Sequence, residues 1–220
     1  MKLNNKYSFS IAVDGGAASG KSTGSKIISK NFNLKLLISG ELYRYMAFRM
    51  IKDRKTISDK KYLIKTAKNI TAKKLKIRKI YEPEVSEYVS LIAREKFIRK
   101  ILKQFQKNFS KNKRFIIEGR DITSKILPNA DLKLFFKCSL KEKAKRRLKE
   151  FKKLNSKITL KEVEKALKKR DFNDKNRKES PLLFVKGAVL VDTTKINLKQ
   201  MEAKLKKLVT SAIKKKYGNI

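Results

Sequence analysis

Five short apolar runs mark the positions where buried strands are expected. They are Tyr7–Val13, Leu34–Ser39, Arg114–Glu118, Leu132–Lys137 and Ala188–Asp192. Most of them are separated by longer segments whose apolar residues recur with helical spacing. Alternating strands and helices are typical of a parallel sheet covered by helices on both faces. We therefore predict an α/β fold built on a five-stranded parallel sheet.

Three of the expected helices have recognisable start signals. A hydroxyl or amide residue followed three positions later by Glu or Gln is a capping box, in which side chain and backbone bond reciprocally. The pairs are Ser139 with Glu142, Thr159 with Glu162, and Asn197 with Gln200. Residues 45–80 are lysine-rich and weakly periodic, so they predict either helices or a small inserted subdomain.

The composition narrows the function classes. At 220 residues with 40% hydrophobic residues, the chain is long and apolar enough to form a core. It has no His, which excludes a histidine metal site or general base, and its single Cys138 argues against a disulfide framework. The apolar run near the N-terminus is too short for a signal peptide, and no stretch is long enough to span a membrane. We therefore expect a cytoplasmic protein without a membrane partner.

The formal net charge of +39 is the most unusual compositional feature. A basic patch or stripe would indicate a nucleic-acid partner. Here the lysines are dispersed along the whole chain, and the sequence is also rich in Asn and Ile. We attribute the charge to a lysine-biased composition and expect it to favour acidic ligands and to make their binding salt-sensitive.

Residues 15–22 contain the strongest chemical signal. The stretch Gly15-Gly16-Ala17-Ala18-Ser19-Gly20-Lys21-Ser22 fits the pattern G-x-x-x-x-G-K-[ST], and Thr23 follows it. It lies between an expected strand and an expected helix, which is the context that this phosphate-binding loop requires. The loop's backbone N–H groups would surround ATP phosphates, Lys21 would contact the outer phosphates, and Ser22 would hold Mg²⁺. Gly24 then falls inside the helix, where glycine costs about 1 kcal/mol relative to alanine.

Two further charged clusters are weaker signals by themselves. The strand that ends at Glu118 is followed by Gly119, Arg120 and Asp121. Because the carboxyl ends of parallel strands meet at one edge, Glu118 should lie beside the phosphate loop and could hold a Mg²⁺-bound water. Arg120 offers a planar donor pair for a phosphate.

The second cluster is formed by Arg170, Asp174 and Arg177. Their i, i+4, i+7 spacing places them on one helix face. Such a face is more often a surface ladder of ion pairs than a site.

Taken together, these motifs resemble bacterial cytidylate kinases. The similarity covers most of the chain in order: the phosphate loop, "SGELYRYMA", "EVSEYVSLIAREKFIR", "EGRDI…LPNADLKLFF", "KRDFNDKNR…SPL" and "VLVDTT". The resemblance implies a nucleoside monophosphate kinase fold over residues 1–220, with a small nucleotide-binding insertion at 40–100 and a lid at 148–168. It also implies transfer of the γ-phosphoryl group of ATP to CMP or dCMP with Mg²⁺, by a monomer without a specific nucleic-acid partner.

The resemblance also implies roles for individual residues. Ser39, Arg120 and Arg177 would contact the acceptor phosphate, and Arg170 and Asp174 would hold the ribose and help close the site. Ser90, Arg99 and Asp121 would recognise cytosine. A carboxylate accepts well from the exocyclic amino group of cytosine, so Asp121 would disfavour uracil. Lys21, Arg120, Arg170 and Arg177 would neutralise charge during transfer.

The sequence departs from the family pattern at several positions. Ile38 stands where the family usually has an acidic residue, and Thr123-Ser124 stands where it usually has Gly-Thr. Ser90 and Arg99 are nine positions apart, which would place them on opposite faces of an unbroken helix. A bend must therefore separate them, or Arg99 is misassigned. Arg146 and Arg147 could reach the ATP phosphates or be surface cations.

Two alternative functions stay open from the sequence. One is another small-molecule kinase of this fold, acting on UMP, AMP or shikimate. The other is a basic P-loop protein that binds nucleic acid and hydrolyses nucleotide, although no nucleic-acid-binding motif accompanies the charge.

Overall fold

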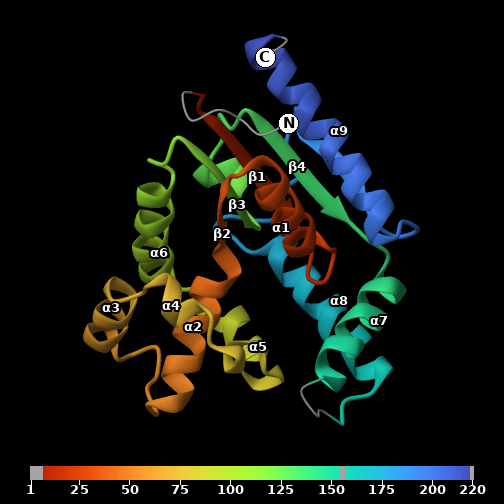
Figure 1. Ribbon diagram of the computed structural model, residues 1–220. Helices are drawn as coiled ribbons and strands as arrows, with labels where there is room; N and C mark the ends of the chain where they lie inside the picture. Colours follow the sequence, from red (N-terminus) through yellow and green to blue (C-terminus); the bar gives the residue numbers. More distant parts are fainter. Residues whose placement is uncertain (1–6, 154–156, 219–220) are drawn as a thin grey trace.

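The computed structural model describes residues 7–153 and 157–218, and within them it forms a parallel five-stranded sheet with helices on both faces (Figure 1). The strand order is β2-β3-β1-β4-β5, and every neighbouring pair is parallel. The strands are β1 (Phe9–Gly15), β2 (Lys35–Ile38), β3 (Arg114–Gly119), β4 (Leu132–Lys137) and β5 (Val189–Asp192). All five predicted strands are confirmed, with ends shifted by no more than two residues.

One face of the sheet packs against the first and last helices, α1 (Lys21–Phe32) and α9 (Leu198–Tyr217). The strand side chains that point to this face include Ile11, Leu134 and Phe136, all fully buried. The opposite face contributes Ala12, Leu37 and Ile117 to a second cluster, which contains the helices that follow β2. Because the strands are covered on both faces, their sequences are nearly continuously apolar.

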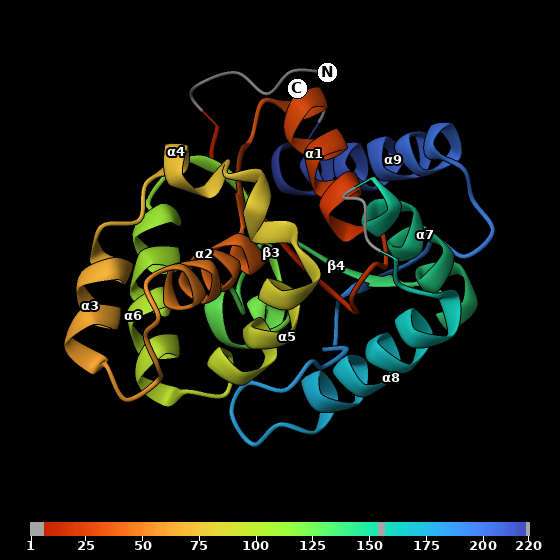
Figure 2. The same ribbon diagram turned by 90° about the horizontal axis from the view of Figure 1, so that it is seen from below.

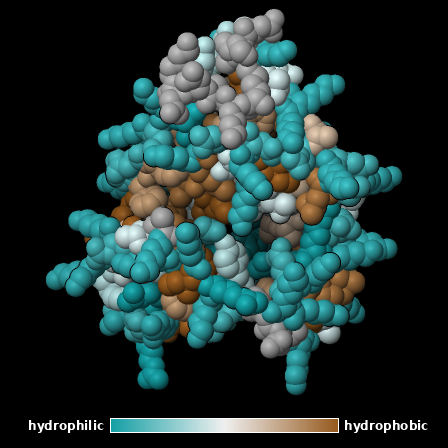
Figure 3. Space-filling view, in the orientation of Figure 1, coloured by the Kyte–Doolittle hydropathy of each residue, from teal (hydrophilic) through white to brown (hydrophobic). Residues whose placement is uncertain are grey.

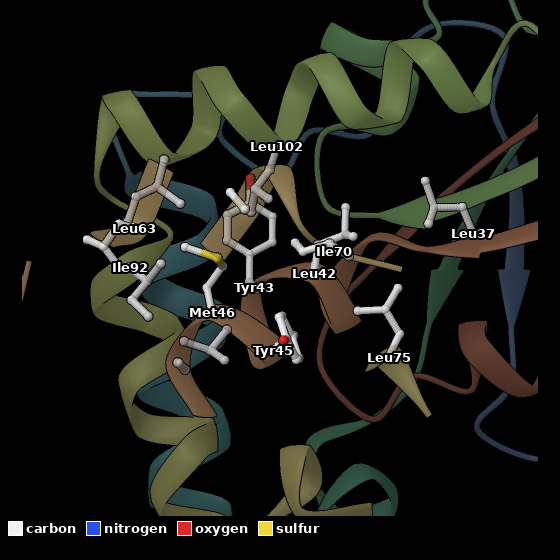
Figure 4. Packing of buried hydrophobic residues seen from close by; sticks show 14 of the residues in the cluster. Leu37, Leu42, Tyr43, Tyr45, Met46, Leu63, Ile70, Leu75, Ile92 and Leu102 are labelled. Carbon is white, nitrogen blue, oxygen red and sulfur yellow. The ribbon is translucent and has the colours of Figure 1, made fainter. Parts of the chain in front are cut away.

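Residues 39–109 form a layer of helices. They are α2 (Ser39–Lys52), α3 (Lys60–Lys68), α4 (Ala72–Leu75), the 3₁₀ turn η1 (Arg78–Tyr81), α5 (Pro83–Ile92) and α6 (Lys96–Phe109). Figure 4 shows side chains from these helices meeting in one cluster, with Leu42, Met46 and Leu102 among them. That cluster also contains Ala12, Leu37 and Ile117 of the sheet, and the segment 45–80 contains helices, one of the two forms that its sequence predicts.

A pair of helices, separate from the layer formed by α2 to α6, follows β4. α7 (Leu140–Lys152) and α8 (Leu160–Asn176) pack on each other through a small apolar cluster that includes Ala144 and Leu167. In Figure 2, α2 to α6 gather on one side of the view, and α7 and α8 on the opposite side. A π-helical turn, η2 (Ile122–Ile126), follows β3. No helix in the described ranges is long and apolar enough to cross a bilayer.

Two of the three predicted capping boxes are confirmed, and one is only half formed. The reciprocal bonds are present at Thr159 with Glu162 and at Asn197 with Gln200. Ser139 does accept from the backbone N–H of Glu142 at 3.3 Å. The Glu142 carboxylate accepts from Arg146 at 2.9 Å, so the predicted return bond to Ser139 was wrong. An available guanidinium one turn away is a stronger partner than a neutral N–H.

Close packing explains the glycine inside α1. A Cβ atom at Gly24 would lie 2.6 Å from Cζ of Phe136 and 3.2 Å from Cδ1 of Leu205. Both neighbours are fully buried, so neither can move aside cheaply. The helix-propensity cost of Gly24 therefore allows α1 to approach β4 and α9 closely. This approach also fixes the position of the phosphate loop, which leads directly into α1.

Figure 3 shows hydrophilic side chains over much of the visible face, with apolar areas near its centre.

Candidate active site

The phosphate loop connects β1 to α1 at the carboxyl edge of the sheet. Its backbone takes positive φ angles at Gly15 (155°), Ala18 (53°) and Gly20 (85°). A Cβ atom at Gly15 would lie 2.5 Å from the carbonyl oxygen of Phe136, so only glycine fits there. The loop ends at the N-terminus of α1, where unpaired N–H groups and the helix dipole favour an anion.

Lys21 is the buried cation of this loop. Its side chain is 7% exposed, and Nζ donates to the carbonyl oxygen of Gly16 at 3.1 Å. Burial and the nearby guanidinium of Arg120 lower the pKa of Lys21 to about 7, against the opposing pull of Glu118. The ammonium group is therefore close to losing its proton at neutral pH, and an arriving phosphate would stabilise its charged form.

Ser22 and Glu118 form a pair of oxygen ligands next to the loop. The Ser22 hydroxyl donates to Oε2 of Glu118 at 2.9 Å, and Glu118 is 2% exposed at the end of β3. A hydroxyl and a carboxylate in contact are the hard oxygen donors that Mg²⁺ prefers. The residues present thus fit a magnesium ion that accompanies a bound triphosphate.

Arg120, Asp174 and Arg177 form an ion-paired cluster facing the loop from α8 and the end of β3. Nε of Arg120 donates to Oδ2 of Asp174 at 2.7 Å, and Nη1 of Arg177 lies 3.5 Å from Oδ1. Burial alone would raise the pKa of Asp174, but Arg120 and Arg170 hold it below its ordinary value. Among the described residues, Nη2 of Arg177 is buried and has no hydrogen-bond partner. An unpaired buried guanidinium nitrogen is expected where an anionic ligand supplies the missing acceptor.

Arg99 and Asp121 form a second ion pair, 2.5 Å apart, beside a smaller pocket of about 230 Å³. The bend that the sequence requires is present, because α5 ends at Ile92 and α6 begins at Lys96. Nη1 of Arg99 donates to the carbonyl oxygen of Ala93 in that break, at 3.0 Å. The break turns Arg99 towards Asp121 without a proline. Ser90 lies in α5, but the position of its side chain falls outside the described residues.

A larger pocket of about 510 Å³ is lined both by the phosphate loop and by charged residues that follow β3 or belong to α8. Of the predicted site residues, its lining contains Ala17, Ala18, Ser19, Gly20, Lys21, Ser22, Thr23, Glu118, Arg120 and Arg170. The smaller pocket contains Arg99 and Asp121. Gly15 and Gly16 shape the loop without being part of either lining, while Asp174 pairs with both Arg120 and Arg177. Ser39 is 4% exposed at the start of α2.

Three arginines in the large pocket extend the predicted set. Arg44 is absent from the set predicted from the sequence, which allows Arg146 and Arg147 either a phosphate contact or a surface position; all three line the pocket. Arg44 is 8% exposed. The sequence signal that could have identified it is a single arginine within the otherwise apolar stretch "LYRYMAF", because a charged residue that is buried usually has a specific partner. Burial, Arg170 and Arg147 all lower the pKa of Arg44.

Gln106 and Asp171 position predicted site residues through side chains. Nε2 of Gln106, 2% exposed in α6, donates to the Ser39 hydroxyl oxygen. Since that oxygen already accepts a bond, the hydroxyl proton is free to donate to a ligand. Asp171 accepts from the backbone N–H of Ala17 at 3.1 Å and from the ammonium of Lys143. Asp171 therefore holds α8 and α7 against the front of the phosphate loop.

Asp14 explains how the departure at Thr123 is accommodated. The carboxylate is fully buried at the end of β1, and it accepts from the backbone N–H groups of Ile122 and Thr123 at 3.0 and 2.8 Å. The Thr123 hydroxyl adds a third bond at 2.6 Å. The strand that leads into the phosphate loop is thus fixed to the segment that follows Arg120 and Asp121.

Comparisons with known proteins agree with the geometry. Residues 11–211 match the family model described as cytidylate kinase. A cytidylate kinase of Fusobacterium nucleatum subsp. nucleatum is 37% identical over 201 residues, covering 87% of this chain and 92% of the relative. A cytidylate kinase of Clostridium tetani is 34% identical over 220 residues, covering 96% and 97%. A crystal structure of an uncharacterized protein from Eubacterium ventriosum shares the fold, with a TM-score of 0.55 and 15% identity over 92% of this chain and 99% of that one.

Proposed function

The chain belongs to the cytidylate kinase family, and from that premise we propose that it transfers the γ-phosphoryl group of ATP to CMP or dCMP. The products are CDP or dCDP and ADP. The single observation that carries this proposal is the pocket of about 510 Å³, which places the phosphate loop and the arginines Arg120 and Arg170 on one cavity. A donor polyphosphate and an acceptor phosphate can therefore meet there.

On the donor side, the loop from Gly15 to Thr23 binds the ATP phosphates through its backbone N–H groups. Lys21 contacts the outer phosphates and becomes fully protonated as they arrive, because an adjacent anion raises an ammonium pKa. Ser22 would hold Mg²⁺ directly and Glu118 would hold it through a water molecule; their side chains lie in contact at 2.9 Å. Bound there, Mg²⁺ would neutralise charge on the phosphate oxygens. Arg146 and Arg147 line the same cavity and add donors for these phosphates.

On the acceptor side, Ser39, Arg120 and Arg177 bind the 5′-phosphate, and the buried unpaired Nη2 of Arg177 supports this role. Arg44 joins them in this proposal. Arg170 and Asp174 hold the ribose, and Ser90, Arg99 and Asp121 recognise the base. Asp121 is already paired with Arg99, which fixes one carboxylate oxygen. The other oxygen can accept from the amino group of cytosine, whereas the carbonyl oxygen of uracil would repel it.

The transfer needs no general base. One oxygen of the acceptor phosphate attacks the γ-phosphorus, and the bond from that phosphorus to the β–γ bridging oxygen breaks. The acceptor is already an anion, so catalysis consists of positioning the two groups and neutralising their charge. Lys21, Arg120, Arg170 and Arg177 provide that neutralisation.

We assign residues 1–220 to one kinase domain, with 40–100 as the acceptor-binding region and 148–168 as a lid that closes over the phosphates and excludes water. Residues 154–156 of this lid lie outside the described residues. We further propose that the protein acts as a cytoplasmic monomer in pyrimidine nucleotide metabolism, without a specific nucleic-acid partner.

An acceptor screen tests the proposal. The protein is assayed for ADP release from Mg·ATP with CMP, dCMP, UMP, AMP or shikimate. We expect the highest kcat/KM with CMP or dCMP. A clear preference for AMP, UMP or shikimate would assign the chain a different acceptor.

A further inference from the structure

Ser86 lies where the acceptor and donor sides of the site meet. It belongs to the first turns of α5 and has a half-buried side chain. Its hydroxyl oxygen accepts from Nη1 of Arg44 and from Nη2 of Arg147, each at 2.9 Å. Arg44 belongs to α2 on the acceptor side, and Arg147 belongs to α7 on the donor side.

The hydrogen-bonding capacity of this hydroxyl is fully used. A serine hydroxyl has one proton to donate and two lone pairs that accept. Ser86 donates to the carbonyl oxygen of Glu82 at 3.0 Å and accepts from both guanidinium groups. Since the donated proton is committed to the helix backbone, both lone pairs face the arginines. Ser86 is therefore oriented as a double acceptor by its own helix.

The two arginines are otherwise held on separate elements. Arg44 also donates to the carbonyl oxygen of Ile80 at 3.1 Å, and its guanidinium lies 5.3 Å from the ring centre of Tyr81. Arg147 pairs with Glu150 at 2.7 Å and lies 4.4 Å from the ring centre of Phe151. These contacts fix each guanidinium on its own side, and Ser86 joins the two sides.

A second contact links the same two regions. Nη2 of Arg78, in η1, donates to the carbonyl oxygen of Lys153 at 3.3 Å, at the C-terminus of α7. Both Arg78 and Lys153 line the large pocket. The segment from Arg78 to Ser86 is therefore bonded to α7 at two points, through Arg78 and through Ser86.

Building on the function proposed above, we propose that Ser86 is a positioning residue that couples binding of the acceptor nucleotide to binding of the donor nucleotide. The two guanidinium groups repel each other, and a bound polyphosphate offsets this repulsion. Donor phosphates at Arg147 then stabilise the bonds that Arg147 and Arg44 already make to Ser86. Less ordering of Arg44 remains to be done when the acceptor binds, so the acceptor binds more tightly.

Calorimetry with a non-reacting pair tests the coupling. CMP is titrated into the free protein and into protein saturated with Mg·ADP, and the ratio of the two dissociation constants is the coupling factor. For the unaltered protein we expect CMP to bind about fivefold or more tightly with Mg·ADP present, within the usual range of such couplings. In Ser86→Ala the ratio should fall to within about twofold of one.

Matched variants separate coupling from a structural role. Ser58→Ala removes an exposed serine of the same helical layer and should keep the coupling factor of the unaltered protein. Ser86→Thr keeps the hydroxyl and its bond to the preceding turn, so it should restore coupling. If the alanine variant does not fold, Ser86→Cys fills the same space but accepts hydrogen bonds poorly, and it should lose coupling.

The outcomes distinguish this inference from the proposed function. If the unaltered protein binds neither CMP nor Mg·ADP, the function itself is wrong. If it binds both with a ratio near one, or if Ser86→Ala keeps the full ratio, the coupling role is wrong. An equal loss of CMP affinity with and without Mg·ADP would also overturn it, because Ser86 would then only support Arg44 locally.

Discussion

The donor and acceptor sides of the site are built in different ways. The donor side is made mainly of backbone, from one contiguous loop whose shape depends on glycines and on the start of α1. The acceptor side is made of side chains from α2, α6, α8 and the segment after β3, and ion pairs hold them together. A contiguous backbone site is specified locally, whereas a convergent side-chain site depends on how distant elements pack. The two sides should therefore respond differently to substitution, pH and loss of packing contacts.

Substituting Lys21, the buried cation of the proposed donor side, should have the largest effect. Lys21→Ala removes the cation next to the outer phosphates, and we expect turnover to fall on the order of a thousandfold. The fold should survive, because burying the ammonium is itself unfavourable. Steady-state assays with thermal melting check both statements. Lys30→Ala, an exposed lysine of the same helix, is the control, and near-normal turnover in Lys21→Ala would contradict the assignment.

Removing the carboxylate of the acceptor side should change selectivity more than rate. Asp121→Ala should reduce the preference for CMP over UMP by about 5- to 150-fold, since one such base contact is worth about 1–3 kcal/mol. Competition between the two acceptors measures this ratio. Because Arg99 fixes Asp121, Arg99→Ala should move the ratio in the same direction. An unchanged ratio in Asp121→Ala would exclude it from base recognition.

Binding at the donor side should be coupled to proton uptake by Lys21, which gives this side a pH dependence of its own. The pKa of Lys21 is lowered to about 7 by burial and by Arg120, so the free protein loses this proton as pH rises through 7. Donor phosphates favour the protonated form, so binding of Mg·ADP should take up almost one proton at pH 8 and little at pH 6. Its affinity should fall about fivefold from pH 7 to 8, because the protonated fraction of Lys21 in the free protein falls by that factor. Calorimetry in buffers of different ionisation enthalpy measures the uptake, and Lys21→Ala should abolish it.

A smaller effect would show how far the donor side depends on tertiary contacts. Asp171→Asn leaves a weaker acceptor for the Ala17 N–H and removes the charge paired with Lys143. We expect kcat/KM for ATP to fall about fivefold, the cost of one weakened hydrogen bond. Steady-state kinetics with ATP varied at saturating CMP test this. The control is Asp131→Asn. Asp131 is ion-paired with Lys216 and precedes β4, at the end of that strand away from the phosphate loop, so its substitution should leave kcat/KM for ATP unchanged.

The features that the sequence predicts correctly are local, whereas those that it misses depend on contacts between distant residues. The five strands, the phosphate loop and two capping boxes are local patterns, because each needs only the spacing of neighbouring residues. Gly24 had no explanation in the sequence, since its neighbours Phe136 and Leu205 are more than 100 residues away. The return bond of Glu142 to Ser139 was wrong because Arg146 competes for the carboxylate.

The acceptor side shows why the remaining contacts could not be predicted. Gln106 and Ser39 are 67 residues apart, and Arg147 and Ser86 are 61 apart. No local pattern records such pairs, because each depends on the angle at which two helices meet. The resemblance supplied Arg99 and Asp121 as candidates, but only the break between α5 and α6 shows how they come into contact.

The sequence by itself determined the sheet, the phosphate loop and the family, because hydrophobic periodicity and glycine-dependent backbone turns act over a few residues. Tertiary structure alone decided which cations face the ligand cavity, which carboxylates hold them, and which hydroxyl joins the two sides. Buried charges require partners, and in a folded chain those partners come from whichever elements packing brings within hydrogen-bond distance.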